Sequence, residues 1–120
     1  AGDLARFYAM MERKGSLDGA TGIQTATAEE AVEFQVKGVD KSTGNFAQRS
    51  LGLALGDERM GKSTGDPLKT FGHSGAGTSI GWADLDSGLA VGYITNGFRG
   101  TATNNARLAA ISQAVRDACT

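Results

Sequence analysis

The chain has 120 residues, enough for one hydrophobic core and too few for two ordinary domains, so we expect a single domain over residues 1–120. Its 12 basic and 13 acidic residues give a formal net charge of −1, so the sequence indicates neither nucleic acid nor a membrane as a partner. One histidine and one cysteine are too few for a His/Cys metal site, and no cofactor is indicated. The 18 glycines, about twice the usual share of roughly 7%, argue against a helical bundle.

The first predicted element is a helix over residues 3–14, which Asp3 can cap. Its apolar residues recur at the spacing of one helical face: Leu4, Phe7, Tyr8 and Met11. The chain starts at Ala1, next to this helix and without an initiator methionine. We therefore expect it to be part of a larger protein.

A loop over residues 16–25 precedes a second, shorter helix. Thr27 and Glu30 have the spacing of a capping box, which predicts that this helix begins there and ends near Val36. The stretch KGVDKSTGN, residues 37–45, contains two glycines and is expected to break the helix.

From residue 46 the apolar pattern changes to a period of two, which predicts strands. The expected strands span residues 46–55, 68–72, 78–84 and 89–96, and LDSG at 85–88 is a suitable turn between the last two. Thr103 or Asn104 can cap a final helix. One side of that helix carries Leu108, Ile111, Val115 and Ala118.

Short connections between the strands indicate an antiparallel sheet of three to four strands, with N-terminal and C-terminal helices packed on it. This order of elements predicts an α+β fold.

Residues 56–63, GDERMGKS, match the phosphate-loop pattern G-x-x-x-x-G-K-[ST]. That loop must join a buried parallel strand to the start of a helix, because the helix end supplies free N–H groups to the phosphates. Gly65 and Pro67 leave no room for such a helix. We expect this stretch to be the flexible, polar tip of a hairpin between strands 46–55 and 68–72, with nucleotide binding through Gly56–Ser63 as a less favoured alternative.

The stretch FGHSGAGTSIGWADLDSGLAVGYITNG, residues 71–97, resembles the C-terminal signature of serine β-lactamase-like hydrolases, the superfamily of class C β-lactamases, DD-peptidases and esterases. In that signature a His/Lys-x-Gly strand is followed by a turn of small residues, a strand, an acidic turn and a strand that ends in Thr-Asn. The resemblance extends over essentially the whole chain. It implies a partial β-lactamase/transpeptidase-like fold.

Three motifs carry the chemistry of this superfamily: a Ser-x-x-Lys nucleophile, a Tyr-x-Asn or Ser-x-Asn element, and a Lys-Thr-Gly or His-x-Gly strand. Only the third is found in this sequence, as His73-Ser74-Gly75. The resemblance implies that His73 and Ser74 offer hydrogen bonds to a substrate and that Gly75 leaves room for it along the strand edge. It also implies that the backbone N–H of Ala76 is one donor of an oxyanion hole, which stabilises negative charge in the transition state.

We therefore expect the C-terminal part of a serine hydrolase, inactive as the isolated chain. Its substrate is then a small ester, amide or β-lactam, provided that an N-terminal half completes the site. The alternative is a non-catalytic binding module that retains a remnant of the fold. Strand edges and a helix face left without neighbours predict a homo-oligomer or a complementary chain as partner.

Several of these residues also have a simpler, structural interpretation. Without the resemblance, His73 is most simply a structural residue. Trp82 and Ile80 are expected in the core, Asp84 and Asp86 in a solvated turn. Cys119 has no basic environment that favours a nucleophilic thiolate.

Overall fold

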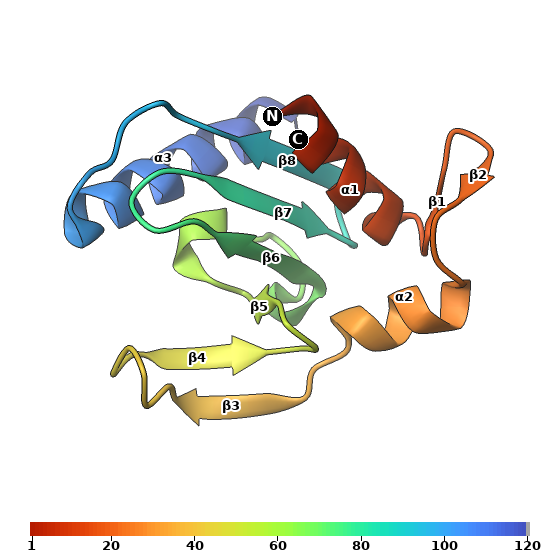
Figure 1. Ribbon diagram of the computed structural model, residues 1–120, viewed down its shortest axis with the longest axis horizontal. Coiled ribbons are helices and arrows are strands. Elements are labelled where there is room, and N and C mark those ends of the chain that lie inside the picture. Colours follow the sequence, from red (N-terminus) through yellow and green to blue (C-terminus); the bar gives the residue numbers. More distant parts are fainter. Residues whose placement is uncertain (120) are drawn as a thin grey trace.

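The computed structural model describes residues 1–119 as three α-helices, a six-stranded sheet and a two-stranded sheet (Figure 1). The α-helices are α1 (Gly2–Glu12), α2 (Thr25–Val32) and α3 (Thr101–Cys119). The strands are β1 (Ser16–Leu17), β2 (Ala20–Thr21), β3 (Val36–Val39), β4 (Phe46–Arg49), β5 (Ala54–Leu55), β6 (Thr70–Ser74), β7 (Ile80–Asp84) and β8 (Leu89–Tyr93). Two 3-10 helices, η1 (Glu58–Met60) and η2 (Pro67–Lys69), lie between β5 and β6.

The large sheet is a meander in which every strand pairs antiparallel with the next one in the chain, in the order β3-β4-β5-β6-β7-β8. The predicted α+β class and antiparallel sheet are confirmed, although the sheet has six strands rather than three to four. None of the helices within residues 1–119 has the length and apolar character needed to cross a bilayer.

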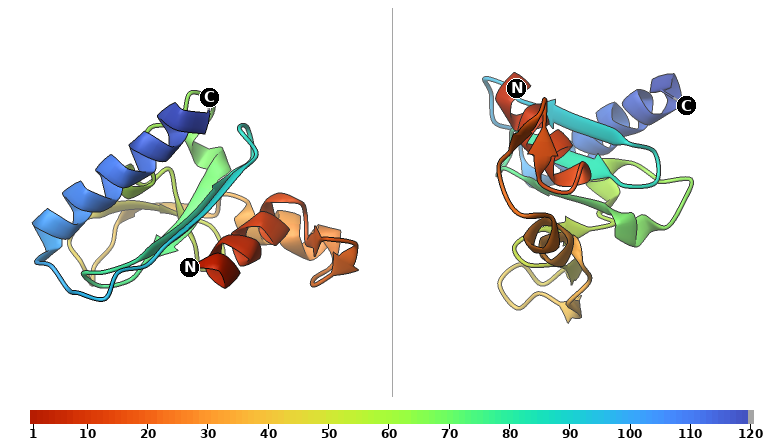
Figure 2. Two further views of the ribbon diagram at one scale, coloured as in Figure 1. Left: turned by 90° about the horizontal axis from the view of Figure 1, so that it is seen from above. Right: turned by 90° about the vertical axis from the view of Figure 1, so that its right-hand side faces the viewer.

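Helices from the two ends of the chain cover opposite faces of the sheet, as the view from above shows (Figure 2). Because side chains alternate along a strand, neighbouring residues of the sheet enter two separate cores. The core on the α1 side contains Tyr8, Met11, Leu55, Phe71 and Ala83. The core on the α3 side contains Ala54, Met60, Ile80, Trp82 and Leu108.

Glycines on the sheet allow α1 to approach β7 and β8 closely. A Cβ at Gly81 would lie 2.3 Å from the Tyr8 ring, and one at Gly92 would lie 2.6 Å from the carbonyl oxygen of Ala1. The Tyr8 hydroxyl also reaches the backbone of His73. Burial raises the pKa of this hydroxyl, while the hydrogen bond with the His73 backbone acts in the opposite direction. Tyr8 thus links the N-terminal helix to β6 next to the His-Ser-Gly motif.

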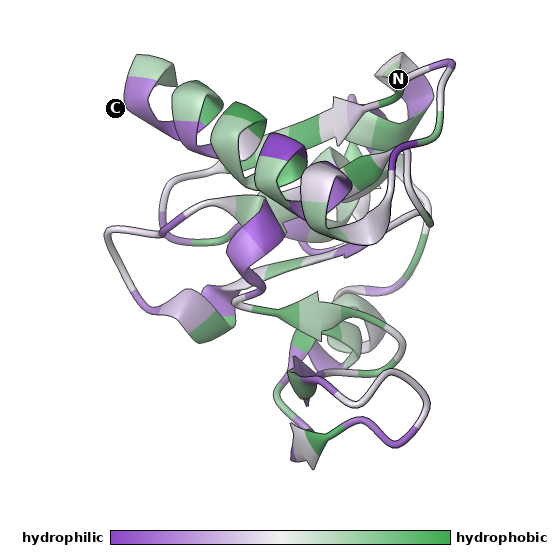
Figure 3. Cartoon of the chain, turned by 90° about the vertical axis from the view of Figure 1, so that its left-hand side faces the viewer, coloured by the Kyte–Doolittle hydropathy of each residue, from purple (hydrophilic) through white to green (hydrophobic). Residues whose placement is uncertain are grey.

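The buried side of α3 is more polar than the sequence pattern indicates. Hydrophilic and hydrophobic segments alternate along this helix (Figure 3). Its buried residues follow a four-residue spacing: Asn104, Leu108, Ser112 and Arg116. Of the four residues expected on the packed side, Leu108 is buried, Ile111 and Val115 are half-buried and Ala118 is exposed. The polar residues face the sheet because it presents hydrogen-bonding groups there; the Trp82 indole N–H, for example, donates to the Ser112 hydroxyl at 3.0 Å.

Two sheet predictions were wrong in detail. Residues 36–39, expected to end a helix and begin a loop, form strand β3, which pairs with β4 through a turn in which Asp40 accepts hydrogen bonds from Ser42. The expected strand 46–55 is divided into β4 and β5 by a turn that contains Gly52 at φ +84°. Glycine adopts this left-handed conformation without the steric penalty that other residues meet.

The predicted capping box was also wrong. Helix α2 begins at Thr25 after Gln24, with no side-chain hydrogen bond at its N-cap, and it ends at Val32 because Glu33 is extended.

Candidate active site

The His-Ser-Gly motif lies where β6 ends and the turn to β7 begins. His73 and Ser74 are the last residues of β6 and pair with Gly81 and Ile80 of β7. Phe71, earlier on the same strand, is fully buried and anchors it in the core. The His73 side chain is exposed, and its Nδ1 lies 2.8 Å from the carbonyl oxygen of Ser74.

These residues line a groove of about 980 Å³, near the upper end of the roughly 300–1,000 Å³ typical of small-molecule sites. Its walls come from β4, the segment after β5, the turn between β6 and β7, and the start of α3. All four residues singled out from the sequence, His73, Ser74, Gly75 and Ala76, line it. They come together because they are contiguous in the chain.

The turn that follows β6 leaves backbone donors unused, and the Ala76 N–H is one of them. The Gly75 N–H donates to the carbonyl oxygen of Ser79 at 2.8 Å, and the carbonyl oxygen of Gly77 accepts from the Arg99 N–H at 2.9 Å. No hydrogen bond within residues 1–119 uses the N–H of Ala76, which is exposed. This N–H is therefore able to donate to a bound molecule.

An ion pair that sequence reasoning missed holds the Ser74 hydroxyl. Asp57 binds the Arg59 guanidinium through both carboxylate oxygens, at 2.7 and 2.5 Å, and Nη1 of Arg59 donates to Ser74 Oγ at 2.5 Å. Burial acts to raise the pKa of Asp57, but the hydrogen bonds from Arg59 outweigh it and the pKa is lowered. The Asp-x-Arg spacing within the polar stretch 56–63 is the one sequence signal, and it does not show that Arg59 reaches β6.

The phosphate-loop-like stretch has neither the secondary structure nor the freedom of a nucleotide-binding loop. Strand β5 before it is antiparallel to β6, and no α-helix follows Ser63 before Thr70. The Lys62 N–H donates to the Gln113 side chain at 2.9 Å, and Met60 is 1% exposed. The expectation of a flexible hairpin tip was wrong, because this segment packs against α3.

Asp84 was expected in a solvated turn, and this was also wrong. Its side chain is buried and forms an ion pair of 2.5 Å with Arg116 of α3. Ser63 donates to the same carboxylate at 3.1 Å. Asp86 is exposed and pairs with Lys69, as a solvated turn residue does, and Trp82 and Ile80 are buried as expected.

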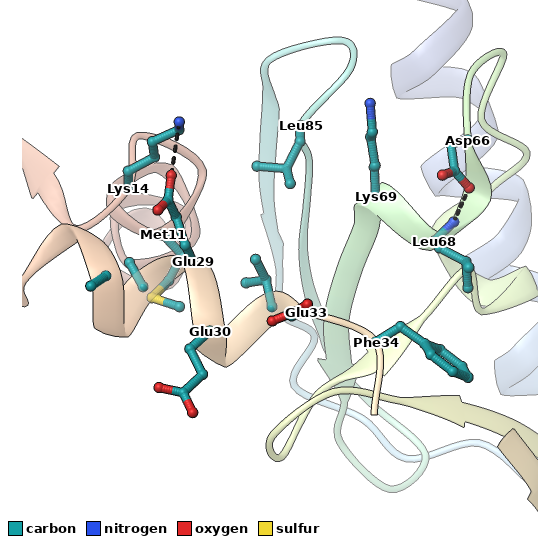
Figure 4. Close-up of a pocket in the computed structure, with 13 residues that line it drawn as sticks. Met11, Lys14, Glu29, Glu30, Glu33, Phe34, Asp66, Leu68, Lys69 and Leu85 are labelled. Atoms are coloured by element: carbon teal, nitrogen blue, oxygen red, sulfur yellow. Dashed lines mark hydrogen bonds and ion pairs between the residues drawn. The ribbon is translucent and has the colours of Figure 1, made fainter. Parts of the chain in front are cut away.

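A second, more apolar pocket lies between α2, the end of α1, η2 and the turn from β7 to β8 (Figure 4). Leu68, Leu85 and Phe34 line it, and Lys14 and Glu29 form an ion pair of 2.9 Å at its edge. None of the residues that the sequence analysis assigned to a site lines this pocket. In the part of the chain that the structure describes, no group of three His, Cys, Asp or Glu side chains is placed to hold a metal ion.

Comparison with known proteins places the chain in a family. The chain matches the beta-lactamase family over residues 1–116 and belongs to that family. No curated protein matches it.

Solved structures of other proteins share the fold. A family VIII carboxylesterase is 27% identical with a TM-score of 0.76, over 98% of this chain and 31% of its own. A penicillin-binding protein homologue from Caulobacter crescentus is 25% identical with a TM-score of 0.74, over 88% of this chain and 29% of its own. A β-lactamase from Mycobacterium bovis has a TM-score of 0.75 at 23% identity, over 99% of this chain and 44% of its own, a likeness of fold alone. The resemblance found in residues 71–97 is thus confirmed, and the chain spans less than half the length of each of these structures.

Proposed function

We propose that this chain is the C-terminal part of a serine hydrolase of the esterase, DD-peptidase and β-lactamase type. It contributes the His-x-Gly strand and one oxyanion-hole N–H to a site that an N-terminal portion completes. The observation that carries this proposal is the unused Ala76 N–H beside Ser74 on the wall of the groove. A fixed backbone donor in that position can stabilise an oxyanion that forms during acyl transfer.

Ser74 and Gly75 have complementary tasks in this proposal. Because Ser74 Oγ accepts a hydrogen bond from Arg59, its own O–H remains available to donate to a substrate carbonyl or carboxylate. Gly75 places no side chain at the strand edge, and a Cβ there would lie 2.6 Å from the Ser79 hydroxyl. His73 adds an exposed ring whose Nδ1 is engaged with the Ser74 carbonyl oxygen, which leaves Nε2 available to a ligand.

The nucleophile has to come from elsewhere. No serine in the sequence has a lysine three residues later, so the Ser-x-x-Lys motif is absent from these residues. We therefore propose that the isolated chain does not turn over substrate, and that a small ester, amide or β-lactam is the substrate of the completed enzyme. A non-catalytic module with the same fold is the alternative that the following experiment tests.

The experiment is fragment complementation. The chain, an N-terminal portion of a related enzyme that carries Ser-x-x-Lys, and their mixture are assayed with p-nitrophenyl esters and a chromogenic β-lactam. We expect turnover by the mixture alone. Loss of one oxyanion donor lowers rates by about 10²- to 10³-fold, so the N-terminal portion should be slow without this chain.

Matched variants locate the site. Gly75→Val should suppress the restored rate by filling the strand edge, whereas Gly97→Val, at an exposed glycine with no atom within 4 Å of a Cβ, should not. Lys62→Ala should leave the rate unchanged, because Lys62 does not line the groove and its hydrogen bond to Gln113 uses the backbone N–H, which alanine keeps. Turnover by this chain alone that survives Gly75→Val would place the active site elsewhere. Assembly of the two portions without turnover would favour the non-catalytic module.

A further inference from the structure

We propose that Arg107 of α3 is a positioning residue that holds the turn between β6 and β7 so that the Ala76 N–H stays presented to the groove. This inference rests on the proposed role of Ala76 and adds the element that fixes it.

Arg107 connects the C-terminal helix to the turn across 30 residues of sequence. Its Nη2 lies 3.3 Å from the carbonyl oxygen of Gly77 and 3.4 Å from that of Thr78. The same nitrogen donates to the Asn104 side chain at 2.7 Å, and Asn104 is itself buried. Asn104 therefore fixes the guanidinium in the place from which it reaches the turn.

The anchors of the turn lie on both sides of Ala76. Upstream, the Gly75 N–H is bound to Ser79, and downstream, the Gly77 carbonyl accepts from both the Arg99 N–H and Arg107. Ala76 is the residue between these anchors. Because the backbone torsions between two fixed points decide where its N–H is directed, weakening the downstream anchor releases that N–H.

Gly77 makes the downstream anchor necessary. Its φ is +70°, and a Cβ there would lie 2.9 Å from the carbonyl oxygen of Arg99. Glycine populates many backbone conformations, so two glycines beside Ala76 leave the turn mobile unless other groups hold it. Among the groups that hold the turn in place, Arg107 supplies the charged side chain.

Stability alone does not explain why an arginine occupies this position. Nε of Arg107 is buried without a hydrogen-bond partner, which is unfavourable. None of the ion pairs within residues 1–119 includes Arg107. A half-buried guanidinium whose Nε lacks a partner, and which is directed at the turn of the proposed oxyanion site, fits a positioning role.

The turn has other support, so loss of Arg107 should not unfold it. The Thr78 hydroxyl bonds to Thr95 at 3.0 Å independently of Arg107. Arg107→Ala should therefore retain the sheet, and the effect should be confined to residues 75–78. Arg107→Lys serves as a milder variant, since it keeps a donor but loses the planar fork.

The test is ¹⁵N NMR of the chain of residues 1–120. In Arg107→Ala we expect the Ala76 and Gly77 amide signals to shift or broaden while those of β7 and β8 stay in place, and millimolar guanidinium to restore them. Arg99→Gln is the matched control, because Arg99 is exposed and supports Gly77 through its backbone. An unchanged Ala76 signal in Arg107→Ala, or an equal change in Arg99→Gln, would overturn the proposal.

Kinetics of the complemented enzyme provide the second readout. Arg107→Ala should lower kcat by about 10-fold or more, a fraction of the 10²- to 10³-fold loss of a whole donor, with KM nearly unchanged. A rise in KM with unchanged kcat would contradict the positioning role. Insensitivity of the restored rate to Gly75→Val would instead refute the proposed function, whatever the Ala76 signal shows.

Discussion

Arg116 binds Asp84 at a point where several segments of the molecule meet. Its Nε donates to the carbonyl oxygen of Met60 at 2.8 Å and its Nη2 to the Thr70 hydroxyl at 3.1 Å, while the guanidinium lies 4.4 Å from the centroid of the Trp82 ring. One side chain of α3 therefore contacts η1, β6 and β7. Because both charged groups are buried away from water, each charge is stabilised by the opposite charge of its partner.

Removing the charge of Asp84 should destabilise the chain strongly. In Asp84→Asn the Arg116 guanidinium stays buried without a carboxylate partner, and breaking such a pair costs about 3–5 kcal/mol. Asp86→Asn is the matched control, since the exposed pair of Asp86 with Lys69 should contribute no more than about 1 kcal/mol. Urea denaturation, followed by tryptophan fluorescence, measures the free energy of unfolding of both variants. Equal losses in the two variants would contradict the assigned importance of the buried pair.

The same pair predicts sensitivity to acid. Burial acts to raise the pKa of Asp84, but the hydrogen bonds from Arg116 and from the Asp86 N–H outweigh it, and the pKa lies below its ordinary value. A carboxyl with a lowered pKa in the folded state stabilises the fold above its unfolded pKa of about 3.9 and loses this contribution as the pH falls toward the folded pKa. The free energy of unfolding should therefore fall below about pH 4. The fall should be smaller in Asp84→Asn, and equal slopes would count against Asp84 as the cause.

The candidate site was predictable only where it is local in sequence. His73, Ser74, Gly75 and Ala76 are adjacent, so one motif identified them together. Arg59 reaches Ser74 across 15 residues, and Arg107 reaches Gly77, just after this stretch, across 30. The hydrophobic periodicity of the sequence does not reveal such long-range contacts, because they depend on how α3 and the segment after β5 are placed on the sheet.

At the scale of elements, the contact of α1 with β7 and β8 depends on residues without side chains. At Gly92 a Cβ would approach backbone atoms of α1, which cannot move aside as a flexible side chain can. The helix thus leaves no room for a side chain at this position of β8.

Gly92→Ala should therefore displace α1. The added methyl would lie 2.6 Å from the Ala1 carbonyl oxygen and 2.8 Å from the Ala5 nitrogen, and overpacking of this kind costs about 1–3 kcal/mol. Gly97→Ala adds the same methyl in open space and should change stability little. Thermal unfolding, followed by circular dichroism, compares the melting temperatures of the two variants. An undiminished melting temperature in Gly92→Ala would show that α1 is not held in this position.

The elements themselves differed in how well the sequence indicated them. Strands β7 and β8 were found because apolar residues alternate and LDSG forms the turn between them. Strand β3 was missed since all four of its residues are exposed, so no apolar alternation marks it. The polar buried side of α3 was missed because a search for apolar residues selects Ile111 and Val115 over Ser112 and Arg116.

At the scale of the molecule, β3 and β8 are the two edge strands of the large sheet within residues 1–119. The hairpin of β3 and β4 stands apart from the helices that cover the rest of the sheet (Figure 1). Its apolar side chains Val36, Val39 and Phe46 are 58%, 67% and 66% exposed. An edge strand of this kind is a template for pairing with another chain.

We expect the isolated chain to self-associate through this hairpin. Light scattering at several micromolar concentrations should show a rising mean mass. Val39→Lys should suppress it by placing a charge on the edge strand, whereas Thr64→Lys, an exposed position in the connection between β5 and β6, should not. A monomer at every concentration would contradict this prediction.

The position of the buried Asp84–Arg116 pair has a consequence for biosynthesis. Asp84 leaves the ribosome well before Arg116, so during translation the end of β7 carries a charge whose counterion is still in the exit tunnel. Until α3 emerges, Trp82 also lacks the hydroxyl of Ser112 and one face of the sheet is bare. We therefore expect the nascent sheet to keep this face exposed until α3 has been synthesised.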